Sequence, residues 1–185
     1  MNIFERAKLM DIQEKDLEQI LDWRNRRLIR NVMYSSDIIS MDQHLQWFEK
    51  LQNSEMNISK IFYFDQVPYG VLNIKEIDKI HQKCEWGFFI GEDNAPKGIG
   101  TILGFTSLNY IFKELLLRKL SAQVLSINER SAIFHEKLGF VQEGMLRQHI
   151  KKEDTYLDIL LYRLFKEEWE EHSIKIQKII EGRYL

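Results

Sequence analysis

The chain has few of the residues that build disulfide frameworks, metal clusters or membrane spans. Its 185 residues include one cysteine and two prolines. One cysteine excludes an intramolecular disulfide framework, and a cysteine-based zinc site needs more thiolates. No window approaches the roughly 20 apolar residues that cross a bilayer, and the first residues lack the apolar core of a signal peptide. We therefore expect a soluble, cytoplasmic protein without a metal or a membrane partner.

The chain also lacks a strong charge of either sign. Its formal net charge is −2, with 44% apolar residues, so nothing in its overall field favours nucleic acid as a partner. There is no internal repeat, low-complexity segment or Pro/Gly/Ser-rich linker. This composition and length predict one globular domain over residues 1–185, with a homodimer as an open possibility.

Hydrophobic periodicity predicts a mixed α/β fold. A helix from Ser40, with Gln43 three residues on, has the form of a capping box. The order strand, helix, strand around residues 99–127 implies a parallel or splayed pair of strands. The expected strands cover 4–12, 58–64, 69–77, 83–90, 120–127, 140–148 and 156–165, with a polar turn at 151–154; the expected helices begin near 16, 40, 99, 129 and 166.

The most informative motif is the turn Gly98-Ile99-Gly100, between the apolar strand ending at Ile90 and an apolar helix. Glycines there let backbone N–H groups approach an anion, and the helix dipole adds roughly half a positive charge. About thirty residues on, Asn128 to Ser131 opens a second helix, which Gly139 closes before another strand. Asn128 is also a good N-cap, which accounts for it without any ligand.

These two segments resemble the GNAT (Gcn5-related N-acetyltransferase) superfamily, which transfers acetyl from acetyl-CoA to an amine. The family's pyrophosphate loop, Gln/Arg-x-x-Gly-x-Gly/Ala, aligns with Ala95 to Gly100; Ala95 departs from it, and Lys97 could supply the charge. The resemblance implies a mostly antiparallel sheet, splayed at the cofactor strands and flanked by helices, with acetyl-CoA as cosubstrate and no metal. It assigns the cofactor contacts to Phe88, Phe89, Ile90, Lys97, Gly98, Ile99, Gly100, Thr101, Asn128 and Ser131.

A second set of residues resembles one branch of this superfamily. Asp22-Trp23-Arg24-Asn25, Met33-Tyr34, the strand Glu85 to Ile90 and Glu143 to Arg147 resemble the nucleotide-amino-sugar N-acetyltransferases of pseudaminic acid biosynthesis. That branch acetylates the 4-amino group of a UDP-linked amino-deoxysugar, by direct transfer in a ternary complex. Ribosomal-protein N-terminal acetyltransferases share part of the pattern and are the alternative. A second alternative is a CoA-binding module without catalysis.

Acetyl transfer needs a neutral amine, a stabilised oxyanion and a proton for the thiolate. Backbone N–H groups of residues 88–90 suit the oxyanion if the neighbouring strand splays away. Glu85 is the expected general base, although a surface carboxylate on an alternating strand is the simpler explanation. Family register places His135 where many members carry a proton-donating tyrosine, whereas spacing alone indicates a partly exposed helix histidine. Cys84 is most simply a small strand residue.

The branch resemblance assigns the acceptor to the N-terminal helices. Arg24 belongs to a basic run whose guanidinium groups suit two phosphates, although some of these cations only offset a helix dipole. His44 and Trp47 lie one helical turn apart, and Trp47 is otherwise a core residue. Trp86 would help to desolvate the amine. The expected acceptor contacts are Arg24, Met33, Tyr34, His44, Trp47 and Trp86.

Overall fold

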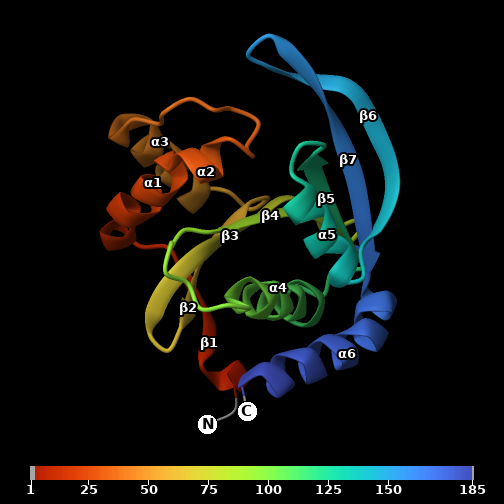
Figure 1. Ribbon diagram of the computed structural model, residues 1–185. Helices are drawn as coiled ribbons and strands as arrows, with labels where there is room; N and C mark the ends of the chain where they lie inside the picture. The colour runs from red at the N-terminus through yellow and green to blue at the C-terminus, as the bar shows by residue number, and fades with distance from the viewer. Residues whose placement is uncertain (1–2, 185) are drawn as a thin grey trace.

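The computed structural model describes residues 3–184, so residues 1–2 and 185 of the predicted domain lie outside it. A seven-stranded sheet runs through the molecule in the order β1-β2-β3-β4-β5-β7-β6 (Figure 1). Its strands are β1 (Ala7–Asp11), β2 (Ile58–Phe64), β3 (Val67–Asp78), β4 (Lys83–Ile90), β5 (Lys119–Leu125), β6 (Val141–Lys152) and β7 (Thr155–Phe165). The helices are α1 (Leu17–Asn25), α2 (Arg27–Arg30), α3 (Met41–Gln52), α4 (Ile99–Asn109), α5 (Glu129–Lys137) and α6 (Lys166–Tyr184).

The sheet is antiparallel except at its centre, where β4 and β5 run parallel. Their ladder is short: it begins at Lys83↔Lys119 and ends at Trp86↔Ala122. Both strands continue beyond that pair, β4 to Ile90 and β5 to Leu125. The mixed, mostly antiparallel sheet with a splay between these two strands is therefore confirmed.

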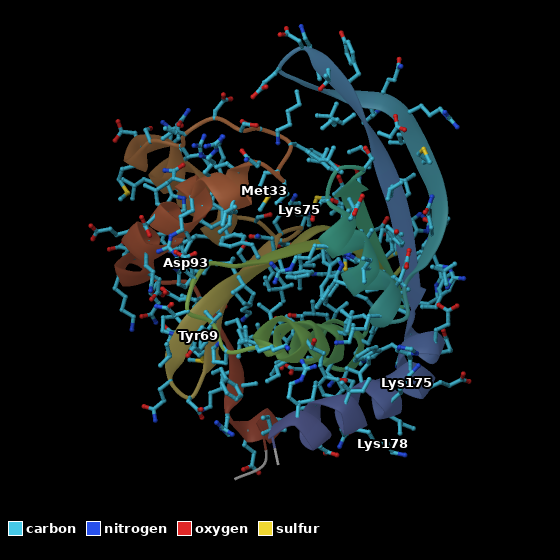
Figure 2. The ribbon with its side chains drawn as sticks, viewed as in Figure 1. Met33, Tyr69, Lys75, Asp93, Lys175 and Lys178 are labelled. Carbon is cyan, nitrogen blue, oxygen red and sulfur yellow. The ribbon has the colours of Figure 1, made fainter. Side chains whose placement is uncertain are left out.

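Neighbouring residues of a strand point to opposite faces of the sheet. Helices pack against the apolar side chains on both faces. Phe62 belongs to the larger core, which residues of α4 and α6 complete. Ile61, one residue earlier, belongs to a smaller core with residues of α1 and α3. Figure 1 shows α4 and α6 together on one side and α1 to α3 apart from them. In Figure 2, Lys175 and Lys178 project outward from α6.

Two expected N-terminal elements are shorter than predicted. The strand expected over residues 4–12 begins with a 3-10 turn, Ile3–Glu5, and pairs with β2 only from Ala7. The helix expected from near residue 16 ends at Asn25, because Arg26 has an extended ψ of 135°. Leu28, an apolar residue at helical spacing from Leu17, Ile20 and Leu21 in the sequence, lies beyond this break and is 79% exposed. No helix within residues 3–184 is long and apolar enough to cross a membrane.

The C-terminal hairpin is longer than predicted and bends midway. β6 continues to Lys152, so the turn expected over 151–154 contracts to Glu153 and Asp154, with Glu153 at a positive φ of 53°. The β6–β7 register shifts between Leu146 and Ile150. There the Gln148 N–H donates to Asp158 Oδ1 at 2.7 Å instead of joining the ladder. Such a bulge bends a strand, and Figure 1 shows the hairpin curving toward the segment between α2 and α3.

Candidate active site

The glycine turn opens α4 as the sequence predicts. Gly98 is the N-cap, with a left-handed φ of 99° that glycine adopts without steric cost. Within residues 3–184, the N–H groups of Gly98 and Gly100 have no hydrogen-bond acceptor, whereas Ile99 donates to Pro96 O and Thr101 to Gly98 O. Two of the N–H groups expected to face the pyrophosphate over residues 97–101, those of Ile99 and Thr101, therefore bond within the turn itself.

The second glycine and a lysine from α5 complete this end of the helix. A Cβ at Gly100 would meet only ordinary contacts, 3.9 Å from Ile90 Cγ1 and from Phe134 Cε2. The space therefore admits alanine, as the Gly/Ala pattern allows. Lys137, left outside the predicted site, donates from Nζ to Thr101 Oγ1 at 3.1 Å. Burial and the charge of Arg183 lower the Lys137 pKa. Lys97 is exposed at the entrance to the turn.

Beyond the end of the β4–β5 ladder the two strands separate, so the edge of β4 that faces β5 no longer pairs with it. Phe88, Phe89 and Ile90 follow the last β4–β5 pair, Trp86↔Ala122, while they still pair with β3 on the other side. An extended, amide-rich chain can add to such an edge as a short strand. The position of these three residues fits the predicted pantetheine contact.

Asn128 caps α5 in the way its sequence position predicts. Its Oδ1 accepts from the Ser131 N–H at 3.2 Å, and this satisfies one of the free donors of the first turn. The two residues expected to contact CoA therefore also form the helix cap.

Glu85 lies in a chain of hydrogen bonds that crosses from one splayed strand to the other. Gln123 on β5 donates from Nε2 to Glu85 Oε2 at 2.7 Å, and Tyr34 donates from its hydroxyl to Gln123 Oε1 at 2.5 Å. Burial raises the pKa of Glu85, and the bond from Gln123 opposes that shift. Burial and the Glu85 charge raise the pKa of Tyr34 to about 12, which keeps its hydroxyl protonated. A half-buried carboxylate with a raised pKa is suited to accept a proton.

Gln123 was missed by the sequence analysis. Its signal is the alternation of β5, in which Lys119, Ser121 and Gln123 occupy the face opposite the buried Leu120, Ala122 and Val124. Glu85 pairs with Ser121 on β5. Gln123, two residues later, therefore lies on the same face of the sheet as Glu85.

One nitrogen of the Arg24 guanidinium group has no hydrogen-bond partner among the described residues. This nitrogen, Nη1, is buried. Burial and the neighbouring charge of Arg30 lower its pKa, and Arg24 also lowers the pKa of Lys152. Three positive groups thus gather near the segment after α2, where an anion would compensate the cost of burying Arg24.

Met33 and Tyr34 follow α2, on a segment that other side chains hold in place. Figure 2 shows Met33 on the part of this segment turned toward the sheet. Asn25 bonds to both the N–H and the C=O of Ile39, at 2.9 and 2.8 Å. Lys152 Nζ donates to Met33 O at 2.9 Å. Met33 and Tyr34, two of the expected acceptor contacts, therefore sit on an anchored segment near Glu85.

The structure places His135 in the core, so the partly exposed position that its spacing indicated is wrong. Its side chain is 4% exposed and packs against Trp86, Phe140 and Tyr162. Nδ1 bonds to Ser131 O at 2.7 Å. Burial lowers the His135 pKa to about 4, which favours the neutral imidazole near pH 7. Apolar neighbours on other elements, which local spacing does not reveal, cause this burial. The proton-donating role that the family register implies stays a prediction.

Three other predicted residues lie in the packing of the fold. Trp86 is 3% exposed and stacks on Phe140, and its predicted part in desolvating the amine stays a prediction. His44 is 4% exposed and stacks on Trp47 at 4.9 Å, and Trp47 packs against the smaller core. Cys84 is 3% exposed, and burial raises its thiol pKa to about 12. This environment does not suit a covalent acetyl-cysteine.

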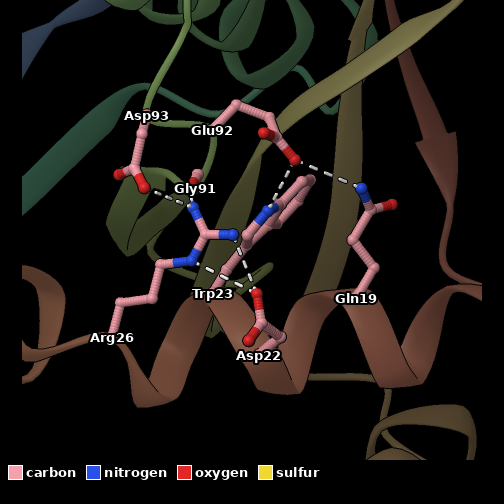
Figure 3. A network of polar contacts seen from close by, with 7 residues as sticks. All are labelled: Gln19, Asp22, Trp23, Arg26, Gly91, Glu92 and Asp93. Carbon is pink, nitrogen blue, oxygen red and sulfur yellow. Dashed lines mark hydrogen bonds and ion pairs between the residues drawn. The ribbon is translucent and has the colours of Figure 1, made fainter.

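A polar network joins α1 to the segment that precedes the glycine turn (Figure 3). Trp23 Nε1 donates to Glu92 Oε1 at 3.0 Å. Arg26 donates from Nη1 to Gly91 O at 2.6 Å and pairs with Asp93 at 3.2 Å. The end of α1 and the segment after β4 are therefore held as one unit.

Comparisons with known proteins agree with this geometry. The profile of the family described as "Acetyltransferase (GNAT) domain" matches residues 9–161. A putative ribosomal N-acetyltransferase, YdaF, of Bacillus subtilis is 26% identical over 86% of this chain and 91% of its own. Acetyltransferase PseH of Campylobacter jejuni is 28% identical over 70% and 80%.

A crystal structure of spermidine N-acetyltransferase from Vibrio cholerae in complex with CoA and spermine superposes with a TM-score of 0.83. It is 22% identical and covers 90% of this chain and 99% of its own. Within residues 3–184, no group of three or more metal-ligating side chains gathers. The chain belongs to the GNAT family of acetyltransferases and is an acetyl-CoA-dependent N-acetyltransferase.

Proposed function

We propose that the acceptor is an amine that also carries phosphate, of the kind found in a UDP-linked amino-deoxysugar acetylated at its 4-amino group. The observation that carries this proposal is the buried, unpartnered Nη1 of Arg24. Arg30 and Lys152 add positive charge around it. A diphosphate supplies two negative charges and pairs of phosphate oxygens that the planar guanidinium group binds bidentately.

The two other acceptor classes fit this charge less well. Spermidine and a protein N-terminus are both cationic, and each would meet Arg24, Arg30 and Lys152 as like charges. Glu85 is the carboxylate that accepts the last hydrogen bond of the chain from Tyr34 through Gln123, and burial raises its pKa. The relatives include proteins described as ribosomal and spermidine acetyltransferases, so both classes belong in the test.

Glu85 is the general base of this proposal. Its carboxylate takes the ammonium proton of the acceptor, directly or through one water molecule, and so yields the neutral amine that attacks the thioester carbonyl. The C–N bond forms, the C–S bond of the tetrahedral intermediate breaks, and the proton that the acetylated nitrogen loses neutralises the departing CoA thiolate. Gln123 holds Glu85 Oε2 in position. The acyl group comes from acetyl-CoA, whose pyrophosphate the open N–H groups of Gly98 and Gly100 would receive. The backbone of residues 88–90 would hold the pantetheine and stabilise the oxyanion.

The experiment follows CoA release by the purified protein with three acceptors: a UDP-4-amino-sugar, spermidine, and a peptide that begins with alanine or serine. The proposal predicts turnover of the sugar nucleotide with the highest kcat/KM. Preference for spermidine or for the peptide would overturn the sugar assignment while leaving an acetyltransferase. Binding of acetyl-CoA without turnover of any amine would indicate the non-catalytic module instead.

A further inference from the structure

We propose that Lys152, at the tip of the β6–β7 hairpin, is a positioning residue that holds the segment of residues 31–34 over Glu85. The proposal goes beyond the identity of the acceptor, but it rests on the proposed role of Glu85 as the base. Lys152 itself touches no reacting group. It would act through Met33 and Tyr34, to which the geometry connects it.

Lys152 binds the segment through a cluster of carbonyl groups. Its Nζ donates to Asn31 O at 2.5 Å, to Met33 O at 2.9 Å and, more weakly, to Arg30 O at 3.4 Å. The ammonium group thus uses its three donors on the carbonyls at the end of α2. Arg30 O also accepts from the Met33 N–H at 3.1 Å, and a cation is favoured beside the carbonyls at a helix C-terminus.

Lys152 reaches this position because of the bend in its hairpin. The Gln148 N–H leaves the ladder and bonds to Asp158, and Gln148 has a positive φ of 48°. Beyond the bulge the strands pair again, through Lys152↔Thr155. The curved hairpin in Figure 1 therefore brings its tip across to the segment after α2, and a side chain about 120 residues away in sequence becomes its clamp.

The other end of the segment leads directly to the proposed base. Tyr34, one residue after Met33, donates to Gln123 Oε1, and Gln123 donates to Glu85 Oε2. An ionised carboxylate only accepts, so Gln123 turns its Nε2 toward Glu85, and the Tyr34 hydroxyl binds the Oε1 that this orientation leaves on the other side. When the segment is held, Glu85 keeps a donor that stabilises its ionised form. Release of the segment removes this constraint.

Charged groups of both signs lie near Lys152. Arg24 lies within electrostatic range and opposes its positive charge, while Glu153 favours it. Arg30 is directed elsewhere, with Nε on Asn25 O at 2.8 Å and Nη1 on Ser36 O. Arg30 therefore supports the same segment from its own side, and the long-range support comes from Lys152 and Gln123.

The test replaces Lys152 by methionine, which keeps the aliphatic stem and removes the donors. Lys151→Met is the matched control, because Lys151 is the exposed neighbour in the same ladder. Hydrogen exchange is measured without any acceptor at the amides of Asn31, Val32 and Met33, which donate within the last turn of α2. We expect exchange about tenfold faster or more in Lys152→Met and unchanged in Lys151→Met.

Kinetics then connect the clamp to catalysis, with whichever amine the protein acetylates. Lys152→Met should raise the acceptor KM about tenfold and move the acidic limb of the kcat/KM profile to higher pH, with acetyl-CoA affinity unchanged. Lys152→Arg, which retains a cation and several donors, should recover part of both effects. Unchanged exchange in Lys152→Met would overturn the clamp. Faster exchange with an unmoved pH profile would overturn the link to Glu85, whatever the acceptor proves to be.

Discussion

The indole ring of Trp23 occupies the space in which a side chain at position 91 would lie. A Cβ built on Gly91 would come within 2.1 Å of Trp23 Cδ2. Trp23 is fully buried, and its Nε1 bonds to Glu92, the residue after this glycine. The helix α1 and the segment leading to the glycine turn are therefore in direct contact.

Gly91→Ala should destabilise the protein by about 1–3 kcal/mol, because the added methyl group overpacks against a buried ring. Chemical denaturation measures the change. Gly87→Ala is the matched control for stability, since a Cβ there meets nothing within 4 Å. Equal stability of the two variants would show that Trp23 can yield and that the contact is loose.

Glu85→Gln should lower kcat/KM by about 10²–10⁴-fold, the usual contribution of a general base. The substitution keeps the shape of the side chain while removing its basicity. The raised pKa of Glu85 also predicts that wild-type activity falls as pH drops through that pKa, and that the variant lacks this acidic limb. Steady-state rates across the pH range measure both effects. A variant with wild-type rates would remove Glu85 from the chemistry.

Gly98→Ala and Gly100→Ala should differ, although both lie in the cofactor turn. Alanine at position 98 must adopt a φ of 99°, which costs roughly 1–2 kcal/mol for a residue with a Cβ. It should lower both the stability and the affinity for acetyl-CoA. Alanine at position 100 fits the space available and should retain both. Thermal shift with and without acetyl-CoA makes the comparison; equal behaviour of the two variants would contradict it.

His135→Gln should flatten the dependence of stability on pH. In the folded protein burial lowers the His135 pKa to about 4, whereas its ordinary value is 6.5. Between these values the unfolded chain binds a proton that the folded protein does not, so stability is full above pH 6.5 and falls as pH drops toward 4. The contribution is of order 3 kcal/mol. Denaturation of both proteins at pH 7 and pH 4.5 measures it, and identical losses would contradict the assignment.

Local sequence signals predicted most of the fold. The capping box at Ser40 appears as expected, with the Gln43 N–H on Ser40 Oγ and the Ser40 N–H on Gln43 Oε1. Gly98 and Asn128 open their helices for reasons carried by the residues themselves. The splay between β4 and β5 followed from the resemblance and from the order of the elements. Each of these features depends on a few neighbouring residues.

The side-chain environments could not be predicted in the same way, because they depend on contacts between distant segments. His135 becomes neutral through rings from β4, from β7 and from Phe140, the residue before β6. Gln123 acquires its role only when Tyr34 reaches it across 89 positions of sequence. Lys152 belonged to a predicted turn, and only a bulge at Gln148 brings it to residues 31–33. Glu85 and Tyr34 were named from the sequence, whereas Gln123, which connects them, was not.

The most direct test of the account compares kcat/KM for a UDP-linked amino-deoxysugar and for the same amino sugar without its nucleotide, in wild type and in Arg24→Gln. If the buried guanidinium receives phosphate, wild type prefers the nucleotide-linked sugar by about tenfold or more. Arg24→Gln then loses most of that preference through a higher KM, with kcat nearly unchanged. Equal kcat/KM for both sugars in wild type, or an unchanged preference in Arg24→Gln, would contradict the account.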